Sequence, residues 1–241
     1  MKRDMLEIFP FIPGARGTVL ICPGGAYSHL SDREAGPVAR MFLAAGWNAA
    51  VLHYSVGDRA ALGWKPLSEL SEAVKELRSL TDGPVGVCGF SAGGHLAASL
   101  GVYWKEKGLT RPDFLVLSYP VITSGPYANE ESVLNLLGEG LGRDEFSLEK
   151  HVTDCVPPVF LWATAADADV PVQNSLMFAD ALSRAKVPFE LHVYPYGAHG
   201  LSLATEEVAQ PEKSRLPDPH VAQWAESCAK WLGYMDLRRG E

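Results

Sequence analysis

The sequence lacks several features that would point to particular classes of protein. Its four cysteines form no C-x-x-C pair and no cysteine–histidine cluster at the spacing of metal ligands. Cys22 and Cys88 lie in apolar runs, which predicts small buried thiols. No stretch approaches about 18 uninterrupted apolar residues, and the first residues lack the apolar core of a signal peptide. We therefore expect no metal site, no membrane span and a cytoplasmic location.

Basic residues are also scarce. The 21 Lys and Arg against 29 Asp and Glu give a formal net charge of −8, with no basic stripe along the chain. Such a protein is a poor candidate for binding nucleic acid or an anionic membrane surface. The 241 residues and the 47% hydrophobic content suit one α/β domain spanning 1–241, and they leave a homo-oligomer open.

Short apolar runs alternate with longer segments of helical periodicity, which is typical of βαβ units. The expected strands are 17–22, 48–54, 84–89, 113–119, 159–165 and 189–194, and the expected helices are 33–45, 67–80, 91–105, 172–185 and 221–234. This alternation predicts an α/β fold, with a mostly parallel central sheet and helices on both of its faces.

Two segments interrupt the alternation. Residues 123–158 are polar and only partly helical, so they form either a small cap over the site or a plain surface excursion. Residues 205–219 are charged and proline-rich, which indicates a loop. In a parallel α/β sheet, ligands bind beyond the carboxyl ends of the strands. Chemically capable side chains should therefore stand directly after predicted strands.

The strongest such signal is the G-x-S-x-G sequence around Ser91. It stands between a predicted strand and a predicted helix, which is the setting of a nucleophile elbow. The turn of an elbow is so tight that small residues must flank the serine, and Gly89, Ala92 and Gly93 meet that need. The elbow would lift the Ser91 hydroxyl above the sheet, at a helix N-terminus whose free N–H groups favour negative charge.

A serine hydroxyl is a weak nucleophile that needs a base. His199 follows the strand at 189–194 through a short loop near the end of the chain, which makes it the candidate base. His53 and His192 lie inside predicted strands, which indicates structural roles. His95 lies four residues into the helix after Ser91, where we expect a hydrogen-bonded core histidine.

The base in turn needs an acid that fixes its tautomer and stabilises the imidazolium. Asp167 and Asp169 both follow the predicted strand 159–165. We assign this role to Asp167 and keep Asp169 as the alternative. Ser91, Asp167 and His199 then each follow a strand, an arrangement that chance produces far less often than the pentapeptide alone.

Acyl transfer also requires N–H donors for the oxyanion of a tetrahedral intermediate. One should be the N–H of Ala92, the residue after the nucleophile. The others should come from the loop after the first predicted strand, where glycines let the backbone approach a substrate closely. Gly25 and Ala26 are the expected donors in that loop, and Tyr27 and His29 are candidates for contacting the substrate.

These motifs resemble the esterase and lipase branch of the α/β-hydrolases, and more narrowly the small acetyl-xylan-esterase-like sugar-ester hydrolases. The resemblance rests on Pro23 to Tyr27, on Gly89 to Ala97, on Asp167 with the following Val-Pro, and on Tyr194 to Ser202. The chain order Ser91, Asp167, His199 is that of the α/β-hydrolase triad. The resemblance implies hydrolysis of short acyl esters, often acetyl groups on sugars. In this sequence Cys22-Pro23 precedes the glycines where related lipases carry a histidine, which weakens a lipase assignment.

The residues together predict a serine carboxylic-ester hydrolase that forms an acyl-enzyme on Ser91 and needs no cofactor. Its partner would be a small-molecule or oligosaccharide ester, such as an acetylated sugar or xylo-oligosaccharide. A peptidase or an arylformamidase could use the same triad, and amide substrates would separate these from an esterase. A non-catalytic hydrolase-like binding protein is the remaining alternative.

Overall fold

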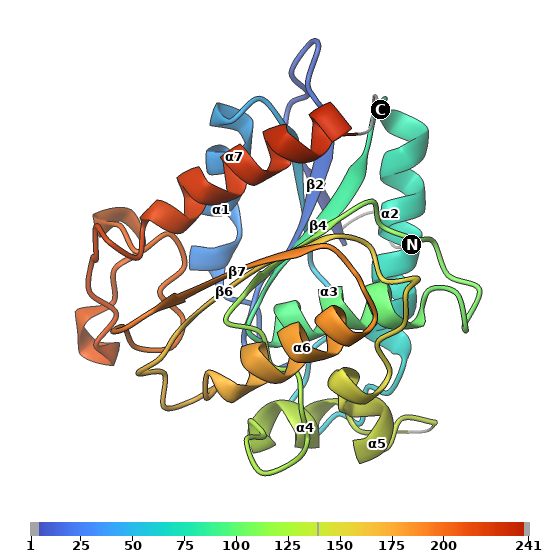
Figure 1. Ribbon diagram of the computed structural model, residues 1–241, viewed down its shortest axis with the longest axis vertical. Helices are drawn as coiled ribbons and strands as arrows, with labels where there is room; N and C mark the ends of the chain where they lie inside the picture. Colours follow the sequence, from blue (N-terminus) through green and yellow to red (C-terminus); the bar gives the residue numbers. More distant parts are fainter. Residues whose placement is uncertain (1–4, 139, 239–241) are drawn as a thin grey trace.

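The computed structural model describes residues 5–138 and 140–238, and the seven strands found there form one sheet (Figure 1). The strands are β1 (Leu6–Ile8), β2 (Thr18–Cys22), β3 (Asn48–Leu52), β4 (Val85–Phe90), β5 (Leu115–Ser118), β6 (Val159–Thr164) and β7 (Phe189–Tyr194). Their order across the sheet is β1-β3-β2-β4-β5-β6-β7. β1 runs antiparallel to β3 and all other neighbours are parallel, which confirms the predicted mostly parallel sheet.

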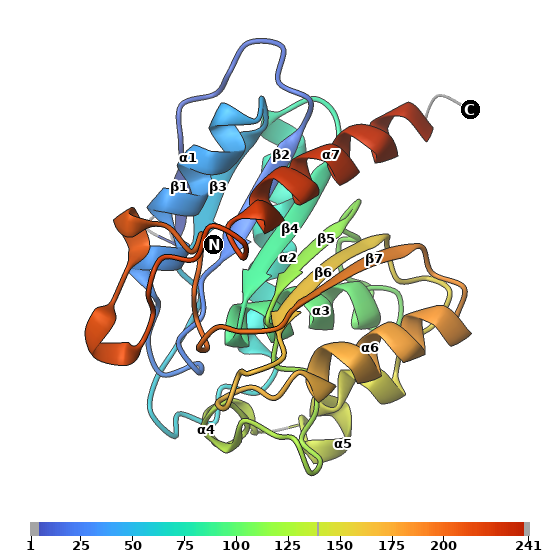
Figure 2. The ribbon, with the colours of Figure 1, turned by 60° about the vertical axis from the view of Figure 1, so that its left-hand side comes forward.

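Helices cover both faces of the sheet, as the alternation predicted (Figure 2). The α-helices of the described residues are α1 (Gly36–Ala44), α2 (Lys65–Leu80), α3 (Ala92–Tyr103), α4 (Glu130–Leu136), α5 (Arg143–Phe146), α6 (Gln173–Arg184) and α7 (Gln223–Arg238). α1 and α7 pack on one face, and α2, α3 and α6 pack on the other. None of the helices in this part of the chain combines the length and apolar character needed to cross a bilayer.

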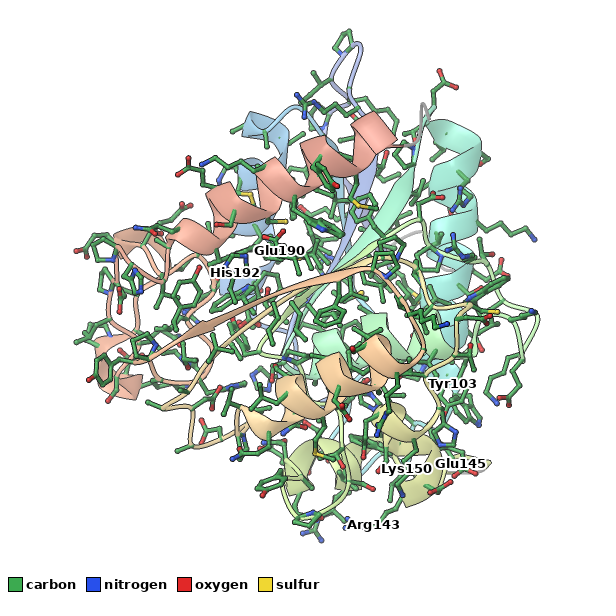
Figure 3. All side chains as sticks on the ribbon, viewed as in Figure 1. Tyr103, Arg143, Glu145, Lys150, Glu190 and His192 are labelled. Atoms are coloured by element: carbon green, nitrogen blue, oxygen red, sulfur yellow. The ribbon has the colours of Figure 1, made fainter. Side chains whose placement is uncertain are left out.

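The central strands are buried along their whole length because helices shield both sides of them. Cys22 and Cys88 lie in two of these strands as free, buried thiols, and burial raises the pKa of both. β7 is an edge strand and is only partly buried. There His192 lies beside Glu190, with their Nε2 and Oε1 atoms 2.7 Å apart (Figure 3).

Four features differ from the sequence prediction or refine it. The short strand β1 was not predicted, because three residues are too few to show a period. His53 lies just beyond β3 and is exposed, with Nε2 3.1 Å from Glu7 Oε2. Residues 123–158 form α4, α5 and a 3₁₀ turn at Leu148–Lys150, and residues 205–219 form a loop with two 3₁₀ turns.

The turn between β4 and α3 brings two backbones unusually close together. A side chain at Gly89 would collide with the carbonyl of Gly93, and one at Gly93 would collide with the carbonyls of Cys22 and Pro23. α3 is buried along its whole length, and small residues on it allow this contact with the sheet. Glycine at these two positions therefore permits the turn that carries Ser91.

Gly93→Ala should destabilise the protein, because the added methyl group meets backbone atoms that cannot move aside. We expect a loss of roughly 3 kcal/mol in the free energy of unfolding, near the upper end of the cost of overpacking a core. Urea denaturation followed by circular dichroism would measure the loss. Gly36→Ala is the matched control, since its new methyl group would meet only the end of the Arg40 side chain. Equal stability of the two variants would contradict the close-approach argument.

Candidate active site

Ser91 occupies the sharp turn between β4 and α3, as the motif predicted. Its φ of 52° and ψ of −118° lie outside the regions favoured for residues with a side chain. Two neighbours hold this strained backbone: the Ser91 N–H donates to the Ser118 carbonyl at 3.0 Å, and the Ser91 carbonyl accepts the Val121 N–H at 3.1 Å. The side chain lies at the N-terminus of α3, beyond the carboxyl end of β4.

A continuous hydrogen-bonded chain links Ser91 to His199 and Asp167. Ser91 Oγ lies 2.8 Å from His199 Nε2, and His199 Nδ1 lies 2.7 Å from Asp167 Oδ2. Because a carboxylate can only accept, Nδ1 carries the proton, which leaves the Nε2 lone pair facing the Ser91 hydroxyl. The imidazole is 10% exposed and the carboxylate 1%. The geometry is that of a nucleophile, a base and an orienting acid.

The second carboxylate oxygen of Asp167 also accepts hydrogen bonds. Its Oδ1 accepts the N–H groups of Asp169 at 3.0 Å and Val170 at 2.9 Å. These two bonds fix the carboxylate in the plane needed to reach His199. The alternative acid, Asp169, lines the pocket beside Ser91, and its backbone carbonyl accepts from Asn129 Nδ2 at 3.2 Å. The carboxylate that contacts His199 is therefore that of Asp167.

The loop after β2 contains the expected oxyanion donors. Gly25 and Ala26 line the same pocket as Ser91. Among the described residues, the N–H groups of Gly25 and Ala26 donate to no other group. Ala92 is the first residue of α3, so its N–H has no acceptor within the helix. None of the three N–H groups has a hydrogen-bond acceptor among the described residues, and they remain candidates for an oxyanion hole.

Tyr27 and His29, both predicted to contact the substrate, lie in different places. His29 lines the pocket. Tyr27 has a φ of 59°, which turns its side chain inward, and it is fully buried against Tyr54 and His95. The Tyr27 ring therefore packs in the core against the loop after β2, the proposed oxyanion loop (residues 23–31), and does not face the pocket.

His95 is the hydrogen-bonded core histidine that the sequence predicted. Its Nε2 lies 3.0 Å from the Phe146 carbonyl, which can only accept, so Nε2 carries the proton and Nδ1 accepts the Tyr27 hydroxyl at 2.9 Å. Burial lowers the pKa of His95 to about 4, although the bond to Phe146 acts in the opposite direction. The imidazole is therefore neutral in the folded protein at any pH well above 4.

Several residues that hold the site together carry no motif in the sequence. Asn135 of α4 is buried and donates from Nδ2 to the Ala26 carbonyl at 2.8 Å. On the other side, Arg215 Nε donates to the His199 carbonyl at 2.8 Å, and Arg33 Nη2 donates to the Gly200 carbonyl at 2.9 Å. The contacts of Asn135 and Arg33 join residues 109 and 167 positions apart, and that of Arg215 joins residues 16 positions apart, so no local motif indicates them.

The pocket in front of Ser91 has a volume of about 260 Å³ and a mostly polar lining. Its described lining residues are Gly25, Ala26, His29, Ser31, Glu34, Ser91, Asn129, Glu131, Asp169, His199, Gly200, Lys213 and Arg215. Asn129 and Glu131 come from the segment 123–158, which thus contributes one wall of the pocket. Throughout residues 5–138 and 140–238, no three His, Cys, Asp or Glu side chains are grouped as metal ligands would be.

The fold, the elbow and the order of the three polar residues define a class of protein. Residues 60–203 match the family described as having the alpha/beta hydrolase fold, and the chain belongs to this family. It is 34% identical to the acetyl ester-xyloside bifunctional hydrolase of Caldicellulosiruptor lactoaceticus, with a TM-score of 0.83 over 95% of this chain and 87% of that one. It is also 34% identical to a sugar hydrolase from Lactococcus lactis, with a TM-score of 0.82 over 98% and 95% of the two chains.

Two longer proteins contain a similar region. The chain is 39% identical to endo-1,4-beta-xylanase B of Butyrivibrio fibrisolvens over 80% of its own length and 33% of that protein. It is 29% identical to an acetylxylan esterase of Xylanibacter ruminicola over 85% of its own length and 45% of that protein. The chain thus spans less than half the length of either relative.

Acid should destabilise the folded state through His95. In the unfolded chain a histidine has a pKa near 6.5, so between pH 6.5 and 4 the unfolded state binds more protons than the folded state. His95 should therefore lower the free energy of unfolding by about 1.4 kcal/mol for each pH unit of fall in this window. Urea titrations between pH 4 and 7 would measure this slope.

His95→Gln is the matched variant, because its amide can still donate to Phe146 and accept from Tyr27. Between pH 6.5 and 4, the free energy of unfolding of this variant should fall less steeply than that of the wild type, by about 1.4 kcal/mol per pH unit. Parallel stability curves for the wild type and the variant would contradict the assignment of a neutral buried imidazole.

Proposed function

We propose that the protein is a serine esterase that hydrolyses short-chain acyl esters through an acyl-enzyme on Ser91. The observation that carries the proposal is the hydrogen-bonded chain from Ser91 Oγ through His199 to Asp167, with distances of 2.8 and 2.7 Å. Proton transfer within such a chain converts a poor nucleophile into one that attacks a carbonyl. The relatives that carry esterase or acetyl-ester names support the same reaction.

In the first half of the reaction, His199 Nε2 takes the Ser91 proton while Oγ attacks the carbonyl carbon of the ester. The carbonyl oxygen becomes an oxyanion that accepts hydrogen bonds from the N–H groups of Gly25, Ala26 and Ala92. Asp167 stabilises the imidazolium that forms. The intermediate then collapses, the bond to the alcohol oxygen breaks, and His199 gives its proton to the leaving alcohol.

In the second half, water replaces the alcohol. His199 removes a proton from the water as it attacks the acyl-enzyme, and the same three N–H groups hold the second oxyanion. Collapse of this intermediate releases the carboxylic acid, and His199 returns a proton to Ser91 Oγ. The chain's own residues supply every proton transfer in this scheme, so it includes no cofactor.

The pocket lining favours a hydroxyl-rich alcohol and a small acyl group. Ala26 is the one apolar side chain among the described lining residues, and the others offer hydrogen-bonding groups or bare backbone. A long acyl chain would find little apolar surface to bury there, whereas sugar hydroxyls would find donors and acceptors. We therefore propose acetylated sugars or xylo-oligosaccharides as substrates, in line with the names of the relatives.

Substitution of the three polar residues tests the proposed chemistry. Ser91→Ala should lower kcat for p-nitrophenyl acetate by about 10⁵- to 10⁶-fold, and Asp167→Asn by about 10⁴-fold because the wrong imidazole tautomer forms. Asp169→Asn should lose far less, since this carboxylate does not contact His199. Equal rates for wild type and Ser91→Ala would remove the proposal, and failure of a fluorophosphonate to label Ser91 would favour a binding protein.

A substrate panel tests the proposed specificity. Among p-nitrophenyl esters, kcat/KM should be highest for acetyl and fall as the acyl chain lengthens, because the polar pocket offers little surface to bury the chain. Acetylated xylo-oligosaccharides should be deacetylated, with acetate release measured by an enzyme-coupled assay. A rate maximum at octanoyl or longer esters would contradict the short-acyl preference, and faster cleavage of matched amides would favour a peptidase or an arylformamidase.

A further inference from the structure

We infer that Glu34 and Tyr119 act as a buried pair of positioning residues. They set the oxyanion loop (residues 23–31) and the His199 loop (residues 195–205) relative to each other. The inference rests on the proposed esterase function and adds two residues to its machinery. Glu34 ends a 3₁₀ turn, Asp32–Glu34, just before α1, and is only 3% exposed. Tyr119 directly follows β5 and is 2% exposed. Neither residue belongs to a recognised motif.

The Glu34 carboxylate accepts one hydrogen bond from each side of the site. Its Oε2 accepts the N–H of Gly24 at 2.8 Å, in the residue before the proposed donors. Its Oε1 accepts the Tyr119 hydroxyl at 2.6 Å. Among the hydrogen bonds of the described residues, the carboxylate makes none to Ser91 or His199, although Glu34 lines the same pocket as both.

Tyr119 extends this connection to the His199 loop. Its hydroxyl oxygen accepts the Ser202 N–H at 2.8 Å while its proton is donated to Glu34. Its ring packs edge-on against the His199 imidazole, with centroids 5.1 Å apart. Burial, together with the nearby Glu34 carboxylate, raises the pKa of Tyr119 well above its usual range, so the phenol keeps the proton that it donates.

The three segments that this pair joins are all strained. Ala26, Tyr119 and Ser202 have φ angles of 51°, 38° and 55°, although none of them is glycine. Such conformations cost about 1–3 kcal/mol each and persist only where surrounding contacts hold them. The Glu34 and Tyr119 bonds reach the backbone of the oxyanion loop and of the His199 loop. We conclude that the pair opposes the relaxation of these loops away from the reactive geometry.

Glu34→Gln separates a positioning role from a merely structural one. The amide oxygen can accept the Gly24 N–H, but the amide N–H₂ then faces the Tyr119 hydroxyl, whose own proton loses its acceptor. If the oxyanion loop shifts, kcat for p-nitrophenyl acetate should fall by about 10- to 100-fold, part of the effect of losing an oxyanion donor. KM should stay within about threefold, because ground-state binding does not use the oxyanion hole.

The variant Tyr119→Phe tests the positioning role independently. It removes the hydroxyl that Ser202 N–H and Glu34 share, while the ring that packs on His199 remains. It should also lower kcat more than it raises KM. The inhibition constant of a boronic acid, which forms a tetrahedral adduct on serine, should rise in both variants by about the same factor as kcat falls, since the adduct needs the oxyanion donors.

Ser71→Ala is the matched control for stability. Ser71 lies on α2, is 4% exposed and accepts the Thr110 N–H through Oγ at 2.9 Å, so its loss also leaves a partly buried donor without an acceptor. All variants would be assayed at least 10 °C below their melting temperatures, as measured by differential scanning fluorimetry. Ser71→Ala should lose stability and keep its kcat.

The outcomes are distinct. A fall in kcat and in boronic-acid affinity for Glu34→Gln and Tyr119→Phe, with Ser71→Ala unchanged, supports the positioning role. Loss of stability alone in the two variants overturns it. If the wild type does not hydrolyse the ester and its Ser91 is not labelled by a fluorophosphonate, the esterase proposal itself has failed. If the wild type is active and both variants match it in kcat, only the present inference has failed.

Discussion

The site depends on one steric constraint, the close approach of β4, α3 and the end of β2. Gly89 and Gly93 lack the side chains that would push these backbones apart. The chain can therefore reverse within one residue, and the strain of that reversal falls on Ser91, with its φ of 52°. A looser turn would lower the hydroxyl toward the sheet, away from His199. The N-terminus of α3, which carries the Ala92 N–H, would move with it.

Buried hydrogen bonds offset this strain on each side of Ser91. The oxyanion loop is held by Glu34 at the Gly24 N–H and by Asn135 at the Ala26 carbonyl. The His199 loop is held at consecutive carbonyls by Arg215 and Arg33. Arg33 and Glu34 are adjacent in the chain, and Asn135 and Arg215 come from two other segments. Polar contacts around the pocket thus hold the loops in the reactive geometry, and the packed apolar core to which these loops are attached is rigid.

Much of this arrangement could be predicted from sequence because its signals are local. A few adjacent residues indicate the G-x-S-x-G turn, and local patterns also indicate each strand and helix. The position of His199 after a strand follows from these. Asp167 was favoured over Asp169, and the structure places the Asp167 carboxylate against His199. A motif does not show which side chains touch across the fold, so no sequence signal marked Glu34.

The orientation of Tyr27 shows the same limit. Its neighbours in sequence suggested a pocket residue, but a left-handed backbone at Ala26 and Tyr27 turns the ring into the core. A sequence reveals such a φ readily where glycine occupies the position, and these positions carry side chains. Similarly, the sequence of residues 123–158 indicated only that this segment interrupts the alternation of strands and helices. Its contribution of Asn129 and Glu131 to the pocket wall depends on tertiary packing.

The wide separation of the three polar residues has a consequence for biosynthesis. Ser91 and His199 are 108 positions apart, and the His199 loop is fastened by Trp224 of α7, whose Nε1–H donates to the Ser202 carbonyl at 2.9 Å. A ribosome-bound chain that has emerged only through residues 195–205 possesses the elbow and His199 but lacks this bond from Trp224. The arrangement around Ser91 is therefore complete only after α7 has been synthesised and has docked, well after the elbow itself has emerged.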